Sequence, residues 1–267
     1  MADVLQEILA HKKTEVQRAR TERSIGHLKS LPGYFLPRRN FYGSVAVPRR
    51  GGPNLIAEMK RSSPSAGLLR EDFDPVAIAR TYEDAGAQAL SVLTDEKYFG
   101  GQLAFIDPIK SHVGLPVLRK DFLIDPYQVH ESRAFGADAV LFIADALEPA
   151  MMVELVALAQ SLDLCILLEV HTRTCLSRVL QTLRVHMRNG VLLGINNRDL
   201  TTQRTDIATT EELARLAPPG VPIVSESGIK TRQDVERMHA AGARALLVGE
   251  TLMRSADPRE TIHELFG

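Results

Sequence analysis

The sequence predicts an α/β protein in which eight strands, each followed by a helix, close into a parallel barrel behind an N-terminal helical extension. Two observations carry this prediction: eight short apolar runs alternate with helical patterns after residue 53, and one phrase recurs at three places. The length of 267 residues agrees, because one such barrel needs about 250. We therefore expect one domain, with residues 1–53 as the extension and 54–267 as the (βα)8, or TIM, barrel.

The extension is expected to begin with a helix, because its apolar residues recur at helical spacing. A stretch rich in Pro and Arg follows over residues 32–53 and is typical of an irregular connection. The apolar residues of the expected helix are Val4, Leu5, Ile8, Leu9 and Val16.

The eight apolar runs are rich in Val, Ile and Leu and almost continuous, as in parallel strands that are buried on both faces. Because they form one uninterrupted series of strand–helix units, they favour a closed barrel over a doubly wound sheet. The runs occupy residues 54–60, 89–95, 116–122, 139–145, 164–170, 191–197, 222–228 and 245–251.

Local signals mark where the helices begin and end. The recurring phrase, over 85–93, 135–143 and 241–249, places a Gly at the expected end of a helix and then begins an apolar strand. Asp followed by Pro suits a helix start, because Asp caps free N–H groups and Pro needs no hydrogen bond there. These pairs are Asp74-Pro75, Asp107-Pro108, Asp125-Pro126 and Asp257-Pro258, and Thr231 with Asp234 resembles a capping box.

Composition excludes several classes of function. The net charge of −1 argues against nucleic-acid binding, which usually needs a basic face. No run approaches eighteen apolar residues and the N-terminus lacks an apolar signal core, so we expect no membrane partner and a cytoplasmic location. Cys165 and Cys175 fit neither a disulfide framework nor a paired metal-ligand spacing, and no metal site is expected.

Polar residues at the strand ends predict where the chemistry lies, because barrels carry their active sites at the carboxyl ends of the strands. Glu58 and Lys60 are two residues apart, so both project to one side of the first strand, expected to be the inside. Lys120 and Glu169 end the third and fifth strands and would share one central volume. Such a Lys and Glu suit acid–base work on a carbon skeleton, although a buried ion network tying strands together is the alternative.

Two glycines suggest a phosphate site. Ser227-Gly228 and Gly249-Glu250 follow the seventh and eighth strands, where many barrels bind phosphate through backbone N–H groups, and Ser63 would add a hydroxyl. The alternative is that both glycines only serve turns. His171 ends the fifth strand, and its place in the pocket or behind the pocket wall is left open.

Six segments, in order along the chain, resemble the signatures of the indole-3-glycerol-phosphate synthase family. The N-terminal helix also resembles that family's extension, so the resemblance spans nearly the whole chain, and the set is far more specific than any one motif. The segments are IAEMKRSSPS (56–65), SVLTDEKYFGG (91–101), LRKDF (118–122), LEVH (168–171), GINNRDL (194–200) and SESGI (225–229).

This resemblance implies an enzyme of tryptophan biosynthesis. The family converts 1-(2-carboxyphenylamino)-1-deoxyribulose 5-phosphate to indole-3-glycerol phosphate with loss of carbon dioxide and water, without a cofactor. The implied partner is this small phosphorylated anthranilate derivative. The oligomeric state is left open, with a monomer as one option, and so are contacts with other tryptophan-pathway enzymes.

The resemblance also implies roles for individual residues. Lys120 would be the general acid at the substrate carbonyl or hydroxyl, Glu169 the base or acid partner in dehydration, and Lys60 a contact to the substrate carboxylate. Which lysine gives the first proton is left open. The other implied catalytic residues, which orient these groups, are Glu58, Asn196 and Glu226, and the implied substrate contacts are Ser63, Pro64, Phe99, Phe122, Arg198, Ser227, Gly228, Gly249 and Glu250.

The sequence departs from the family pattern at one position, and two alternative functions have to be considered. Ala66 stands where the family often has Lys, in a loop expected to cover the site, so loop closure or turnover is in question. A phosphoribosylanthranilate isomerase is one rival, but it would carry Cys near Glu58 and Lys60. A non-catalytic barrel that binds a phosphorylated metabolite is the other, and it would have lost an acid or a base.

Overall fold

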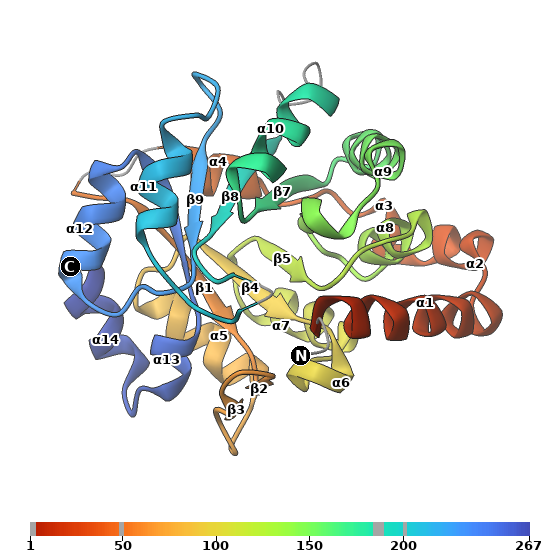
Figure 1. Ribbon diagram of the computed structural model, residues 1–267. Helices are drawn as coiled ribbons and strands as arrows, with labels where there is room; N and C mark the ends of the chain where they lie inside the picture. The colour runs from red at the N-terminus through yellow and green to blue at the C-terminus, as the bar shows by residue number, and fades with distance from the viewer. Residues whose placement is uncertain (1–3, 48–50, 184–189, 200–201) are drawn as a thin grey trace.

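Eight parallel strands form a closed barrel in the computed structural model, which describes residues 4–47, 51–183, 190–199 and 202–267 (Figure 1). The hydrogen-bonded order β1-β10-β9-β8-β7-β6-β5-β4 confirms the predicted (βα)8 barrel, and each strand overlaps one predicted run. Leu200, the last residue of the fifth motif, lies outside the described residues. The barrel strands are β1 (Asn54–Met59), β4 (Ala89–Leu93), β5 (Val117–Lys120), β6 (Ala139–Ile143), β7 (Cys165–Val170), β8 (Val191–Asn196), β9 (Ile223–Glu226) and β10 (Ala243–Val248).

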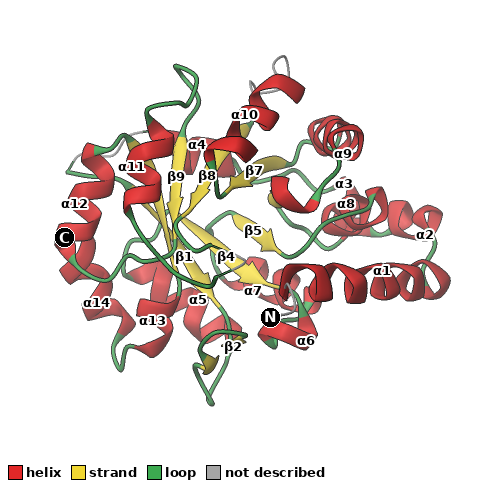
Figure 2. Ribbon diagram, viewed as in Figure 1, coloured by secondary structure: helices red, strands yellow, loops and turns green. Residues whose placement is uncertain are grey.

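Helices surround the strands (Figure 2). In the described part of the chain none of them is long and apolar enough to cross a membrane. The helices after residue 53 are α5 (Pro75–Asp84), α6 (Glu96–Phe99), α7 (Ile106–His112), α8 (Pro126–Ala134), α9 (Pro149–Ser161), α10 (Arg173–Thr182), α11 (Ala208–Ala214), α12 (Arg232–Ala240), α13 (Glu250–Arg254) and α14 (Pro258–Phe266), with 3-10 turns η1 (Leu103–Phe105) and η2 (Ala144–Ala146).

Most predicted helix signals are confirmed. The side chains of Asp74, Asp125 and Asp257 each accept a backbone N–H at a helix start, and Thr231 forms a capping box with its partner three residues on. The prediction for Asp107 is wrong: η1 runs directly into α7, so the chain is already helical when it reaches this residue. The glycines at 86, 136 and 242 have φ values of 89°, 89° and 99°, as expected for a left-handed helix end.

The extension contains more helix than the sequence pattern indicates. The predicted first helix is α1 (Val4–Glu22), and α2 (Ile25–Ser30) follows. The expected irregular connection over 32–53 is wrong in part, because α3 (Pro32–Phe35) and α4 (Phe41–Ala46) lie within it. Phe41 and Val45 of α4 are buried among the side chains inside the barrel, so tertiary packing stabilises a helix that is too short to form alone.

Side chains alternate between two apolar cores along each strand. In β1, Leu55 and Ala57 pack outward against the helices, whereas Ile56 packs inside the barrel. Leu118 of β5 and Leu167 of β7 also pack inside. The residues two positions further along these strands must therefore face the interior at the carboxyl end of the barrel.

Candidate active site

The interior layer at the carboxyl ends of the strands is charged. Glu58, Lys120, Glu169 and Glu226 each lie two residues beyond an apolar residue that packs inside the barrel. They come from β1, β5, β7 and β9 and all line one cavity of about 1090 Å³. The strand alternation that builds the core thus also delivers these four groups to one place.

All but one of the predicted site residues line this cavity. Ser63 is the exception: it is buried in β2 (Ser62–Ser63), where its hydroxyl accepts a hydrogen bond from Ala66 N at 3.2 Å. The strand β3 (Gly67–Leu68) pairs with β2, and Ser65 between them lines the cavity. The predicted residues that line it are Glu58, Lys60, Pro64, Phe99, Lys120, Phe122, Glu169, Asn196, Arg198, Glu226, Ser227, Gly228, Gly249 and Glu250.

Apolar side chains form part of the cavity wall. Leu141, Ile143 and Leu247 line it and belong to the interior core. Phe99 and Phe122 face each other with ring centroids 6.2 Å apart. Helix α1 adds further apolar residues, which sequence reasoning assigned only to a helix face and not to the site: Val4, Leu5 and Ile8.

Lys120 is a buried ammonium surrounded by carboxyl groups. Its Nζ lies 3.4 Å from Glu169 Oε2 and 3.7 Å from Glu226 Oε2. Burial alone would lower the pKa of Lys120, but the charges of Glu169, Glu226 and Glu58 outweigh it and raise the pKa above its ordinary value. Lys120 is therefore protonated at neutral pH.

Glu169 and Glu226 differ in protonation. Burial would raise the pKa of Glu169, but Lys120 and His171 hold it well below its usual range. Burial and the nearby charge of Glu169 raise the pKa of Glu226 well above its usual range. One carboxyl group of the pair is thus a base and the other an acid, and both oxygens of Glu226 lack hydrogen-bond partners among the described residues.

Glu58 and Lys60 project to one side, as their spacing predicts, and there they form an ion pair. Lys60 Nζ donates to Glu58 Oε1 at 2.6 Å. Burial opposes the ionised form of Glu58, but Lys60 and Lys120 outweigh it and lower the pKa of this carboxyl group. These five side chains, Glu169 and Glu226 included, thus bring two lysines, two ionised carboxyl groups and one protonated carboxyl group into the cavity wall.

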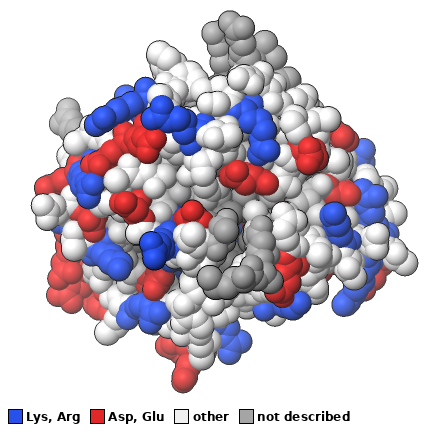
Figure 3. Space-filling model, viewed as in Figure 1, with Lys and Arg blue, Asp and Glu red and all other residues white. Residues whose placement is uncertain are grey.

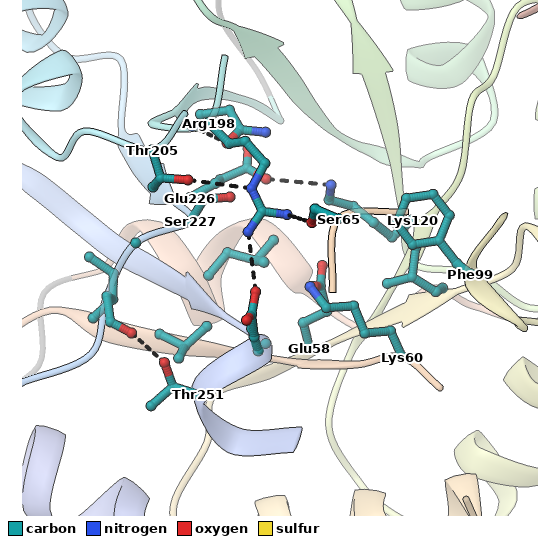
Figure 4. A pocket seen from close by; sticks show the side chains of 18 of the residues that line it. Glu58, Lys60, Ser65, Phe99, Lys120, Arg198, Thr205, Glu226, Ser227 and Thr251 are labelled. Carbon is teal, nitrogen blue, oxygen red and sulfur yellow. Dashed lines mark hydrogen bonds and ion pairs between the residues drawn. The ribbon is translucent and has the colours of Figure 1, made fainter. Parts of the chain in front are cut away.

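Arg198 connects three loops around the mouth of the cavity (Figure 4). It donates to Ser65 Oγ at 3.0 Å, Glu250 Oε2 at 3.2 Å and Thr205 Oγ1 at 3.4 Å. These three contacts hold the segments around residues 65, 205 and 250 together through one guanidinium group.

The turn after β9 has an unusual backbone. Ser227 has φ 68° and Gly228 has φ 84°, so two consecutive residues lie in the left-handed region. Asn197 Nδ2 donates to the carbonyl oxygen of Ser227 at 2.9 Å and holds this turn. Left-handed non-glycine residues cluster at functional sites, where the surroundings enforce them.

Charges of both signs are interspersed over the molecular face shown in Figure 3, without a large area of one sign. This distribution agrees with the net charge of −1 and offers no extended basic surface on that face.

Comparison with known proteins decides the family. A family model described as indole-3-glycerol phosphate synthase matches residues 5–265. The chain belongs to this family. It is 48% identical over 267 residues to the indole-3-glycerol phosphate synthase of Acidithiobacillus ferrooxidans, covering 100% of this chain and 99% of the relative. It is 46% identical to that of Geobacillus thermodenitrificans over 264 residues, covering 99% of this chain and 97% of the relative.

Solved structures support the fold at lower identity. A 3-hexulose-6-phosphate synthase has a TM-score of 0.60 at 16% identity, covering 79% of this chain and 97% of the other. The enzyme of the same name from Salmonella typhimurium has a TM-score of 0.63 at 15% identity, covering 79% and 96%. These similarities show the barrel fold alone.

Proposed function

We propose that this protein, as a member of the indole-3-glycerol phosphate synthase family, closes the indole ring of 1-(2-carboxyphenylamino)-1-deoxyribulose 5-phosphate as a carboxy-lyase. The observation that carries this proposal is Lys120, a protonated lysine held between an ionised Glu169 and a protonated Glu226. This set can give and take protons at one carbon skeleton without a cofactor.

Ring closure needs a proton donor. The ring carbon that bears the carboxylate attacks the ketone carbon, and the electron pair of the C=O bond moves onto oxygen. Lys120 donates a proton to that oxygen and offsets the developing charge. Glu226, whose carboxyl oxygen lies 3.7 Å from Lys120 Nζ, can then return a proton to the lysine.

Decarboxylation follows and restores the aromatic ring. The bond between the ring carbon and the carboxylate breaks, and its electron pair returns to the ring. Lys60, which lines the cavity, would contact the carboxylate before it leaves, and Phe99 with Phe122 would pack the ring. Apolar walls favour loss of the charged group because carbon dioxide is neutral.

Dehydration completes the indole. The hydroxyl group formed at the former ketone carbon leaves as water with a proton from a site acid. Glu169 takes the proton whose bonding electrons form the new double bond. Its ionised state at neutral pH suits this base role.

We place the substrate phosphate at the turns after β9 and β10. Ser227, Gly228, Gly249 and Glu250 line the cavity there, as the phosphate prediction requires. Binding the phosphate away from the reacting carbons orients the substrate. Ser63 remains a prediction in this role, although Ser65 lies closer to the cavity.

The test is indole fluorescence after addition of the carboxyphenylamino-deoxyribulose phosphate. The chain has no Trp, so the protein background is low. Wild type should form product, whereas Lys120→Ala should lose about 10²–10⁴-fold in kcat. Lys13→Ala removes an exposed lysine from α1 and should retain activity. Product formation that survives in Lys120→Ala would move the acid role to Lys60.

The rival functions are less well supported. An isomerase would be expected to use a Cys after the first strand, but Cys165 and Cys175 are buried and do not line the cavity. A binding barrel would show no turnover in the same assay, and folded wild type without turnover would favour it. A cytoplasmic location stays a prediction.

A further inference from the structure

His171 stands behind the cavity, in contact with the proposed base. It follows β7 directly, two residues after Glu169, and its side chain is 6% exposed. Its Nε2 lies 3.1 Å from Glu169 Oε1, and its Nδ1 lies 2.9 Å from Asp145 Oδ2. It is absent from the cavity wall, so it can influence the reaction only through Glu169.

Both ring nitrogens of His171 face carboxylates. The Nδ1 contact is a hydrogen bond and the Nε2 contact is an ion pair by distance; because an ionised carboxylate offers only lone pairs, both contacts are favourable when each nitrogen carries a proton. A neutral ring would turn a lone pair toward one of the two negative groups. The geometry therefore suits an imidazolium. Burial alone would lower the pKa of His171, but Asp145 and Glu169 outweigh it and raise the pKa to about 10.

Glu169 consequently lies between two cations. Lys120 from β5 approaches Oε2 and His171 approaches Oε1. The other groups that act on this cluster are Glu226 from β9, Glu58 from β1 and the amide of Asn196 from β8. Lys120 is shared with Glu226, so it does not by itself decide which carboxyl group keeps the proton. Of the two carboxyl groups, Glu169 is the one that His171 contacts.

Asp145, the second partner of His171, is held by contacts within η2 and from α10. Asp145 belongs to η2 after β6, and its side chain is 31% exposed. Arg178 of α10 donates to the carbonyl oxygen of Ala144 at 2.6 Å. Burial would raise the pKa of Asp145, but hydrogen bonds from His171 and Cys175 and the charge of Arg178 lower it. Asp145 is thus held as an anion.

We propose that His171, held by Asp145, is a positioning residue that keeps Glu169 ionised and turns its Oε2 toward Lys120, so that the shared proton of the carboxyl pair stays on Glu226. This inference rests on the proposed function for its kinetic consequence. His171 and Asp145 would influence the reaction through the charge and orientation of Glu169, without touching the substrate.

The first test is the pH dependence of kcat in His171→Gln. Loss of the cation raises the pKa of Glu169, so the acidic limb of the profile should move to higher pH by about one unit. Below the wild-type limb kcat of the variant should be about 10-fold lower than that of wild type, whereas above the new limb kcat should match wild type and KM should stay within about twofold. His263→Gln, which changes an exposed histidine of α14, should leave the limb in place.

The second test reads His171 directly. In wild type, the histidine C–H NMR signal that disappears in His171→Gln should not titrate between pH 5 and 8. In Asp145→Asn the same signal should titrate at lower pH, because one of its two carboxylates is neutral.

The two tests separate the inference from the proposed function. A His171 signal that titrates near 6.5 in wild type would overturn the positioning role even if synthase activity is present. A uniform loss of kcat in His171→Gln, without a shift of the limb, would overturn it as well. Absence of turnover in wild type would reject the function, while the NMR titration would still decide the protonation of His171.

Discussion

Two proposed catalytic carboxyl groups owe their position to glycines across from them. A Cβ atom on Gly249 would lie 2.4 Å from Glu58 Oε1, and one on Gly194 would lie 2.3 Å from Glu226 Oε1. Gly249 has φ −126°, which any residue can adopt, so its backbone does not require glycine. The absent side chain makes room for the carboxylate, a purpose that the sequence pattern, which suggested phosphate, did not reveal.

Gly249→Ala should therefore damage the site more than the fold. The new methyl group would displace Glu58 and its partner Lys60, and a shift of about 1 Å in such groups costs up to about 10²-fold. We expect kcat, measured in the fluorescence assay, to fall at least about 10-fold, and KM to rise as well because Gly249 also lies at the proposed phosphate site. Gly26→Ala, where a Cβ would meet nothing closer than 3.7 Å, is the matched control. A rise in KM with kcat unchanged would contradict the displacement of Glu58 and leave the phosphate contact as the only role of Gly249.

At the scale of elements, one buried lysine joins the extension to the barrel. Lys12 of α1 contacts Asp95 at 2.8 Å and Asp121 at 3.0 Å, and all three side chains are at most 4% exposed. Asp95 also caps α6, which carries Phe99. Asp121 directly follows Lys120. The contact thus fixes α1 over the cavity and braces two loops that carry site residues.

Lys12→Met should destabilise the protein by about 3–5 kcal/mol at pH 7, because it removes the lysine from buried Asp95 and one of the two cations from buried Asp121. Burial would raise the pKa of Asp121, but Lys12 and Arg119 hold it well below its usual range. The resulting stability is present above the unfolded-state pKa of about 3.9 and is lost as pH falls below it.

Urea unfolding at pH 7 and pH 4 checks this prediction. The difference between wild type and Lys12→Met should narrow at pH 4, where the unpaired carboxylates of the variant accept protons more readily. Lys13→Met, which changes an exposed neighbour in α1, should stay within about 0.5 kcal/mol of wild type. If Lys12→Met lost the same free energy of unfolding at both pH values, the stabilisation by Lys12 would not be ionic.

Across the whole molecule, the features that follow from short periods along the chain were predictable. The period of two placed Glu58, Lys120 and Glu169 inside one barrel end, and capping chemistry placed the start of α5 correctly. The contact of Lys12 with Asp121 was not predictable, because it joins distant segments through burial alone. The same holds for His171 with Asp145 and for the helix that closes the opposite end of the barrel.

That opposite end provides the last prediction. Phe41 of α4 is 1% exposed and packs with Ile56, Leu118 and Leu167 inside the barrel, below the charged layer. In these barrels stability and chemistry are assigned to opposite ends of the strands. Phe41→Ala should leave a cavity and cost about 3–5 kcal/mol in the free energy of unfolding.

Its kcat and KM, measured well below the unfolding transition, should stay within about twofold of wild type, because the charged layer keeps its partners. Phe35→Ala is the control, since that ring is 73% exposed and its loss should change stability by less than about 0.5 kcal/mol. If Phe41→Ala lowered kcat as strongly as it lowered stability, the two ends of the barrel would be coupled. The interior core would then position Lys120 and Glu169 as well as stabilise the fold.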